Sequence, residues 1–435
     1  MEAEVTKNTL KQQVIDSIDN DKAVRFLQSL IRLPSPSGSP TLPQELVSNC
    51  FERMNMRIDR FKGNAEGVAS HPDYCPLPEG EEMDEEAYNL VGVKQGSDPE
   101  GKSLMLFSHI DTEAPANLSG TNPYRHEIID GRLYGLGAAD AKSGIATMIL
   151  AAEAVLKVTD LHGDLILMSI LGKKGGSAGT LSAVERGYRA DGAVYIHAAE
   201  TGHGFREIKC YSMGTVDLRI IVEGAEGVPN DELDNSEVNA VEKGAQIIKA
   251  LRDWDNARRA RLLFDDGSYR GSPKTKLHIG LARGGTYVGT DPVLFEIQCR
   301  LYFGVGETME SVISDMRVYL SRLCEEDRWL SEHPPRIEKM YLRASPASIP
   351  KDAPISSAVR GCIGAITGNT DVIYQYHGAS DIRLPILYGR TDTVGIGPKC
   401  GGLYGQEWTD WVDIEDYLTG IKIVASLIVD WCVKE

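Results

Sequence analysis

Three short segments place imidazole and carboxylate side chains directly after apolar runs, where the ligand sites of α/β proteins normally lie. In the first, the apolar run 104–107 is followed by Ser, His109, Ile and Asp111. Residues two apart on a strand point to the same side, so Asp111 can orient the His109 imidazole. That pairing suits a metal ligand with its supporting carboxylate, or a proton relay. A structural hydrogen bond at the end of a strand is the plainer alternative.

The second and third segments are similar in kind. Residues 133–144 read Leu-Tyr-Gly-Leu-Gly-Ala-Ala-Asp-Ala-Lys-Ser-Gly, which puts Asp140 near the start of an apolar helix. Capping that helix is the commonest role for such an Asp, and neither common Gly-rich phosphate-binding motif is present. The third segment, 192–202, ends an apolar run with His197 and Glu200. Together the three segments bring His, Asp and Glu to the strand ends of one domain.

The elements around these segments predict an α/β fold with a mixed, mostly parallel sheet flanked by helices. Apolar strands are expected at 104–107, 165–171 and 192–196, with a helix at 143–156 between the first two. Such alternation of apolar strands and helices is typical of a buried, largely parallel sheet. One amphipathic helix is expected over 9–32, before a stretch rich in Pro and Ser.

From about residue 208 the pattern changes to the β-α-β-β-α-β order of a ferredoxin-like unit. Its expected strands and helices are, in chain order, 210–222, 239–255, 276–282, 294–303, 309–324 and 336–342. We therefore predict a domain over 208–345 inserted into an α/β domain made of 1–207 and 346–435.

Composition narrows the class of protein. Lys and Arg total 46 against 63 Asp and Glu, a net charge of −17, which disfavours nucleic-acid and membrane partners. No apolar run approaches the length of a membrane span, and the N-terminal stretch does not read as a signal peptide. The eight cysteines are scattered without a Cys-x-x-Cys pair. These features predict a cytoplasmic, soluble protein of more than one domain, and they do not indicate what it acts on.

With Gly-Ala-Ser-Asp-Ile-Arg at 378–383 and Gly-Ile-Gly-Pro at 395–398, the three segments resemble the zinc-dependent exopeptidases and deacylases. That group includes acetylornithine deacetylase, succinyl-diaminopimelate desuccinylase, aminoacylase and carboxypeptidase G. The resemblance extends over nearly the whole chain. It implies the fold of that group, in which the inserted ferredoxin-like unit is a lid that usually dimerises, and hence a homodimer.

The resemblance also implies a ligand set. The residue that matches Asp140 bridges two metals in such enzymes. One of these metals would be held by His109, Asp140 and an acid in the third segment, for which Glu200 is the best match and His197 a competing one. Asp111 would lie behind His109 and hold its tautomer. We expect one divalent ion per chain, Mn²⁺ or Zn²⁺.

The chain departs from this group at the second metal and the general base. The two glutamates that serve them are replaced by Lys173 and Lys174. The stretch 401–411, where a ligating His is expected, has none, and whether Gln406, Glu407 or His197 supplies a further ligand stays open. The lid histidine that reaches across the dimer is also missing. Which residue replaces the base stays open.

Two interpretations of the lysine pair remain. It is either a solvated basic turn, or a positive site that replaces the second cation and binds a substrate carboxylate. His377, Tyr376 and Arg383 belong to a segment that lines the substrate cleft in the resembled enzymes, so we expect substrate contacts from them. For the two aromatic residues, a half-buried strand is the plainer alternative.

With one metal and no carboxylate base, an ordinary amide is a hard substrate. We therefore expect hydrolysis of an activated C–N bond, by metal-activated water, in a small substrate that carries a carboxylate. An electron-poor aromatic amine that releases ammonia, as in a nitroanthranilate-type aminohydrolase, fits this description. The alternatives are deacylation of N-acyl amino acids and a non-catalytic binding protein on the same fold.

Overall fold

The computed structural model describes residues 2–36, 41–62, 68–75, 86–114, 122–173, 176–199, 201–226, 238–261, 276–402 and 410–434. The chain divides into two compact units. Unit 1 comprises Met1–Ser212 and Ala347–Glu435, and unit 2 comprises Met213–Pro346. The sequence places the inserted domain over 208–345, and its roles as a lid and a dimerisation surface stay predictions.

Unit 1 contains a mixed sheet in which neighbouring strands follow the order β1-β2-β6-β3-β7-β14. β6, β3, β7 and β14 are parallel, whereas β1 and β2 are antiparallel to their neighbours. The predicted α/β fold with a mixed, mostly parallel sheet is therefore confirmed. The strands are β1 (Arg57–Lys62), β2 (Tyr88–Lys94), β3 (Leu104–His109), β6 (Leu165–Ile170), β7 (Gly192–Ile196) and β14 (Thr393–Ile396).

The central strands are buried on both faces, and alternate residues supply two apolar clusters. In β3, Leu104 and Leu106 belong to the cluster that contains residues of α4 and α11. Met105 and Phe107, which point the other way, belong to a second cluster. Two covered faces explain why these strands read as continuous apolar runs in the sequence.

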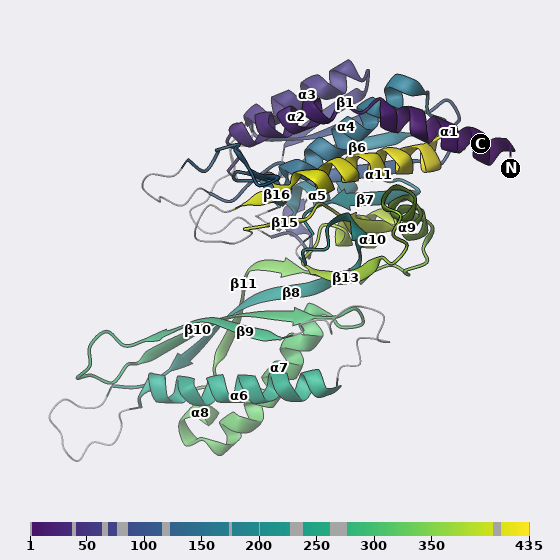
Figure 1. The fold of residues 1–435 in the computed structure, drawn as a ribbon. Coiled ribbons are helices and arrows are strands. Elements are labelled where there is room, and N and C mark those ends of the chain that lie inside the picture. Colours follow the sequence, from purple (N-terminus) through teal and green to yellow (C-terminus); the bar gives the residue numbers. More distant parts are fainter. Residues whose placement is uncertain are drawn as a thin grey trace, which may run out of the picture. The chain divides into compact units, whose positions relative to one another are not determined.

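Helices surround this sheet, and α11 packs against α4 (Figure 1). The prediction of a single helix over 9–32 is wrong, because this stretch forms parts of two helices, α1 and α2, with non-helical residues between them. Asp19 begins α2 by accepting a hydrogen bond from the backbone N–H of Lys22, as short polar residues do at helix starts. The helices are α1 (Glu2–Asp16), α2 (Asn20–Arg32), α3 (Thr41–Arg53), α4 (Ser143–Val158), α5 (Ala178–Glu185), α9 (Pro354–Thr367), α10 (Arg383–Gly389) and α11 (Ile414–Cys432), with short helical turns η1 (Val68–Ser70) and η3 (Gly204–Arg206).

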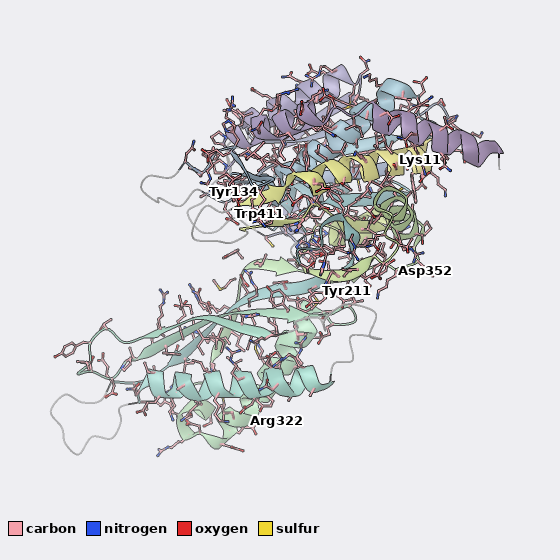
Figure 2. The ribbon with its side chains drawn as sticks, in the orientation of Figure 1. Lys11, Tyr134, Tyr211, Arg322, Asp352 and Trp411 are labelled. Carbon is pink, nitrogen blue, oxygen red and sulfur yellow. The ribbon has the colours of Figure 1, made fainter. Side chains whose placement is uncertain are left out.

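A second, small antiparallel sheet brings the chain before Asp140 next to the chain before α11. Its strand order is β15-β16-β5-β4, and Trp411 pairs with Tyr134 across it (Figure 2). The strands are β4 (Ile128–Ile129), β5 (Arg132–Tyr134), β15 (Cys400–Gly401) and β16 (Trp411–Asp413). The segment around Trp411 is thereby held next to the turn that carries Asp140.

Unit 2 has a four-stranded antiparallel sheet in the order β9-β10-β8-β11 with its own apolar core. Trp254 on α6 and Phe303 on β10 belong to that core. Its elements are β8 (Glu207–Glu223, shared with unit 1), α6 (Ala240–Arg261), β9 (Leu277–Gly284), β10 (Leu294–Phe303), α7 (Met309–Glu326), α8 (Arg328–Glu332) and β11 (Arg336–Ala344). Apart from the short α8, this is the β-α-β-β-α-β order of a ferredoxin-like unit.

The rest of unit 1 comprises β12 (Ala347–Ser348) and β13 (Ile373–Gly378), which both pair with β8. All eight cysteines are buried and free of disulfides. None of the helices in the described part of the chain has the length and hydrophobicity needed to cross a membrane.

Candidate metal centre

The neighbouring parallel strands β3 and β7 end at the same edge of the sheet, and a histidine stands at each end. His109 is the last residue of β3, and His197 directly follows β7. Phe107 and Tyr195 are register partners two residues earlier, so alternation carries both histidines to the same side of the sheet. The rings of Tyr195 and His197 stack with their centroids 5.1 Å apart. Parallel pairing therefore places the two imidazoles side by side.

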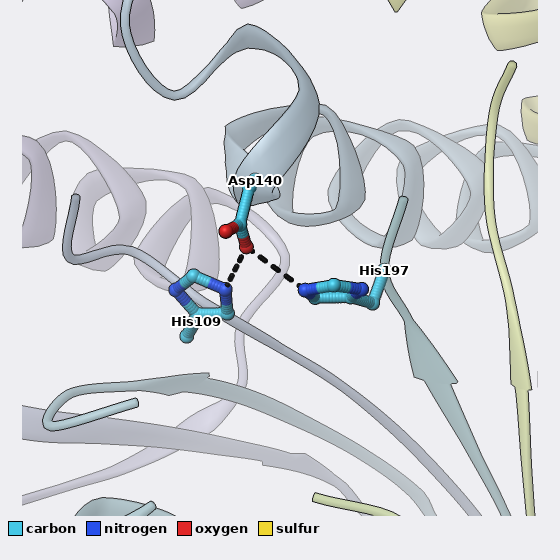
Figure 3. A group of neighbouring side chains, drawn as sticks. All are labelled: His109, Asp140 and His197. Atoms are coloured by element: carbon cyan, nitrogen blue, oxygen red, sulfur yellow. Dashed lines mark hydrogen bonds and ion pairs between the residues drawn. The ribbon is translucent and has the colours of Figure 1, made fainter. Parts of the chain in front are cut away.

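Asp140 reaches both histidines from the helical turn η2 (Ala138–Lys142), which leads into α4. Its Oδ1 atom lies 2.7 Å from Nε2 of His109 and 2.8 Å from Nε2 of His197 (Figure 3). The backbone of Asp140 is extended there, with φ −123° and ψ 86°. The N-cap position of α4 is occupied by Lys142, so the capping role that the sequence allowed for Asp140 is not the one that it has.

Asp410 holds the turn that carries Asp140. Its carboxylate accepts hydrogen bonds from the backbone N–H of Gly137 at 2.6 Å and of Ala139 at 3.0 Å. Gly137 has a φ of 86°, a conformation that glycine adopts without strain. The sequence did not indicate Asp410, because only the pairing of β16 with β5 brings it to this turn.

His109 is held from behind by Asp111, mainly through the backbone. Its Nδ1 atom lies 2.9 Å from the carbonyl oxygen of Asp111 and 3.4 Å from the Oδ1 atom of that residue. A carbonyl oxygen only accepts, so Nδ1 carries the hydrogen and donates it. In a neutral His109 the lone pair of Nε2 then faces the carboxylate of Asp140. Two acceptors 2.7 Å apart require a cation between them, either a proton or a metal ion.

Burial and charge act in opposite directions on the two imidazoles. Burial tends to lower the pKa of His109, but the negative charge of Asp140 and hydrogen bonds to Asp111 and Asp140 outweigh it, so the pKa is raised. For His197, burial outweighs the same carboxylate and its pKa lies well below the usual range. His197 is therefore neutral, the form in which imidazole binds metals.

The residues fit a divalent metal ion. Ligand atoms of His109, Asp140 and His197 all lie within 4.8 Å of one another. Two imidazoles and one carboxylate suit Zn²⁺, Mn²⁺ or Fe²⁺.

The structure thus places His197, the competing match, at the third corner of the centre, beside the predicted ligands His109 and Asp140. Four residues singled out in the sequence lie outside the described residues, namely Lys174, Glu200, Gln406 and Glu407. Glu200 therefore stays a prediction as a metal ligand.

Lys173 follows β6 at the same sheet edge, and its side chain is only 14% exposed. Its Nζ atom lies 2.7 Å from Oδ1 of Asp381 and donates to the carbonyl oxygen of Ala379 at 2.9 Å. The ammonium is therefore engaged within the protein, and a solvated basic turn does not describe this residue.

The three residues expected to contact substrate occupy different environments. His377 is buried, with its ring centroid 5.1 Å from that of His197. Tyr376 is half-buried, and as the neighbour of His377 on β13 it points to the opposite face. Arg383 is 1% exposed, and its Nη2 atom donates to the carbonyl oxygen of Gly176 at 3.3 Å. The structure thus brings His377, and not Tyr376, beside the metal centre.

Comparisons with known proteins point to one family. The model of peptidase family M20/M25/M40 matches residues 105–430. N-formyl-4-amino-5-aminomethyl-2-methylpyrimidine deformylase of Bacillus subtilis is 28% identical over 395 residues, covering 80% of this chain and 84% of the relative. Succinyl-diaminopimelate desuccinylase of Methylibium petroleiphilum is 25% identical over 305 residues, covering 68% and 73%.

The fold of the yeast dipeptidase Dug1p, from Saccharomyces cerevisiae, superposes with a TM-score of 0.72. It covers 97% of this chain and 98% of the dipeptidase at 13% sequence identity, which is a likeness of fold alone. The family match includes the two strand ends and the helical turn that carry the three candidate ligands. The chain therefore belongs to peptidase family M20/M25/M40 and is a metal-dependent hydrolase of that family.

Proposed function

We propose that this hydrolase cleaves a C–N bond in a small substrate that carries a carboxylate, with one divalent metal ion per chain. The observation that carries the proposal is the buried group of His109, Asp140 and His197, whose ligand atoms lie within 4.8 Å of one another. When bound, a divalent ion there would lower the pKa of a coordinated water and polarise the substrate.

The protein's own contribution at this centre is orientation and exclusion of water. Asp111 fixes the His109 tautomer through its carbonyl oxygen, and the stack of His197 on Tyr195 fixes the second ring. His109 is fully buried and His197 is 3% exposed. Ligands held in this way bind without rearrangement, and charges act strongly in so dry a site.

The environment of Arg383 supports the proposal that the substrate is an anion. It is 1% exposed, and within the described part of the chain its Nε and Nη1 atoms have no hydrogen-bond partner. A buried guanidinium with unsatisfied N–H groups is costly unless a ligand completes it. A carboxylate matches its planar fork with two parallel hydrogen bonds.

The departures at the base position favour an activated substrate. Lys173 stands where the resembled enzymes have their general-base glutamate, and its ammonium is engaged by Asp381. Without that carboxylate, a compact acyl group such as formyl or an electron-poor aromatic carbon is easier to attack than a peptide. The names of the relatives, a deformylase and a desuccinylase, support deacylation of an N-acyl substrate. The aromatic amine that the sequence suggested is the second candidate, for which the activation argument is the only support.

A small substrate panel tests the proposal. N-formyl and N-succinyl amino acids, their neutral carboxamide analogues, and a nitro-substituted aminobenzoate are incubated with chain loaded with Zn²⁺ or Mn²⁺. Release of amine or ammonia is measured. We expect turnover of carboxylate-bearing substrates that is lost in His109→Ala and kept in His162→Ala. His162 is a suitable control because it lies outside the metal centre and its ring accepts a hydrogen bond from the backbone N–H of Lys434. Tight metal binding without turnover of any substrate would favour the non-catalytic binding protein.

We also expect a homodimer through unit 2. β9 lies at the end of the described sheet of that unit, with one edge that is not paired in the described part of the chain. Light scattering at micromolar concentration tests this expectation, and a monomer would contradict it.

A further inference from the structure

The carboxylate of Asp381 is surrounded by donors. Besides the ammonium of Lys173 at 2.7 Å, it accepts hydrogen bonds from the hydroxyl groups of Ser177 at 2.6 Å and Thr180 at 2.5 Å. Its side chain is 1% exposed. Although burial tends to raise the pKa of this carboxyl, the charge and hydrogen bond of Lys173 and the two hydroxyls hold it well below the usual range. Asp381 is therefore ionised and fully paired.

Arg383 lies beside this carboxylate without pairing with it. Its Nη2 atom donates to the carbonyl oxygen of Gly176, while the hydroxyl of the next residue, Ser177, donates to Asp381. The guanidinium and the carboxylate thus dock on consecutive residues of one turn. Arg383 is equally buried, yet Nε and Nη1 have no partner within the described residues.

A buried guanidinium and a buried carboxylate that bind the same turn would be expected to pair, because each is otherwise an uncompensated charge. Here the donors around Asp381 come from Lys173 and from two hydroxyls. We propose that Lys173 is a positioning residue: by neutralising Asp381, its ammonium keeps the guanidinium of Arg383 free to bind the carboxylate of the substrate. This inference rests on the proposed function, since it presumes an anionic substrate.

The proposal gives a physical meaning to the lysine at a position where the resembled enzymes have a glutamate. A carboxylate at 173 would remove the ammonium that now pairs with Asp381 at 2.7 Å and would add a second negative charge near it. We would then expect Asp381 to pair with Arg383, whose guanidinium binds the neighbouring residue of the same turn. The replacement of glutamate by lysine at 173 thus eliminates the general base of the resembled enzymes. It also leaves the guanidinium of Arg383 available to bind an anion.

Four variants of the full-length, metal-loaded chain test the inference: Lys173→Met, Lys173→Arg, Asp381→Asn, and the double variant Lys173→Met with Asp381→Asn. Calorimetry measures the affinity for benzoate, a carboxylate probe, and for benzamide, its neutral match. Lys173→Met should weaken benzoate binding about ten- to a hundred-fold, the loss expected for one hydrogen-bonded charge contact. Lys173→Arg should bind as wild type does, and none of the variants should change the affinity for benzamide.

The double variant decides between positioning and direct contact. Removing the competing carboxylate should restore benzoate binding to the wild-type level, even though the lysine is still absent. Equal weakness in the single and the double variant would overturn the proposal, because it would mean that Lys173 contacts the anion itself. Wild-type affinity in Lys173→Met would overturn it as well.

Lys243→Met is the matched control. Lys243 pairs with Asp327 at 2.5 Å in unit 2, and the two side chains are 21% and 18% exposed. This variant loses a comparable lysine–aspartate pair and should keep full benzoate affinity. A similar loss in Lys243→Met would overturn the proposal, because the effect of Lys173→Met would then be general.

Lys173→Met will fail to fold if it leaves a buried carboxylate unpaired, whereas the double variant buries no unpaired carboxylate. In that case the double variant alone is measured, and weak benzoate binding by it overturns the proposal. Should the wild type bind no benzoate, the anionic substrate of the proposed function fails, and a crystal structure of Lys173→Met decides the pairing separately. We expect an ion pair between Asp381 and Arg383 in that structure; an Arg383 that stays on Gly176 alone would overturn the inference.

Discussion

His109 and His197, whose ring centroids lie 5.6 Å apart at the ends of adjacent parallel strands, direct their Nε2 atoms to the same oxygen of Asp140. Strand pairing alone brings the two imidazoles together, and the turn before α4 adds the carboxylate. The lone pair of His109 faces a carboxylate oxygen, so this arrangement calls for a cation at its centre.

The third ligand can be identified by comparing two variants. His197→Ala should lower the metal affinity more than about a hundred-fold, because loss of a direct ligand exceeds the usual effect of losing a supporting residue. Glu200→Gln should have a smaller effect. Elemental analysis after dialysis measures both, with His162→Ala as the control. If His197→Ala retained the metal and Glu200→Gln lost it, the third metal ligand would be Glu200 and not His197.

Asp111 should matter less than a ligand does. Because the His109 Nδ1 atom donates to the backbone carbonyl of Asp111 at 2.9 Å, Asp111→Asn keeps this bond and removes the negative charge at 3.4 Å. We expect a fall in metal affinity of about ten-fold, at the low end of the range for supporting residues. A loss as large as that of His109→Ala would mean that the carboxylate, and not the carbonyl, holds the ring.

The α/β sheet and the place of His109 at the end of a strand could be predicted from the sequence, because continuous apolar runs mark the strands locally. The ligand roles of His109 and Asp140 were implied only by the family resemblance, since Asp140 lies on the helical turn η2. The contact of His197 with Asp140 could not be predicted, since it depends on the residue at which β7 ends. The roles of Asp410 and of the Lys173–Asp381 pair depend on contacts between segments more than 200 residues apart in the chain, which no local pattern reveals. The break between α1 and α2 was missed because the apolar periodicity continues past Asp19.

Gly144, near the start of α4, lets this helix approach the ends of β3 and β7. A Cβ atom there would lie 2.1 Å from the carbonyl oxygen of Ile196 and 2.5 Å from the hydroxyl of Ser108, the residues before the two histidines. Gly144→Ala should therefore destabilise the fold by about 1–3 kcal/mol, the usual cost of overpacking, and weaken metal binding. Denaturant unfolding measures the change in stability.

Gly361 provides the matched control for this change. It lies within α9, and a Cβ atom added there would meet nothing within 4 Å. Gly361→Ala should leave metal binding unchanged and should stabilise the fold by up to about 1 kcal/mol, the difference in helix propensity. Equal effects of the two substitutions would contradict the close approach at Gly144.

Asp416 should give the stability of the protein a specific pH dependence. Burial raises its pKa to about 6, although the backbone N–H groups of Lys399 and Phe205 donate to it. A carboxyl whose pKa is higher in the folded state stabilises the fold at low pH, and this contribution is lost as the pH rises from about 4 to about 6. Relative to wild type, Asp416→Asn should gain up to about 3 kcal/mol of unfolding free energy over that window. Urea unfolding at several pH values measures it, and a difference that does not vary with pH would contradict the raised pKa.

Titration of metal-free chain with Zn²⁺ or Mn²⁺, followed by hydrolysis of the best substrate of the panel, tests the central claim most directly. We predict that activity is absent without metal, rises with added ion and reaches its maximum at one ion per chain, and that His197→Ala shows no such rise. A maximum at two ions per chain, or full activity in the presence of a chelator, would contradict a single metal held by His109, Asp140 and His197.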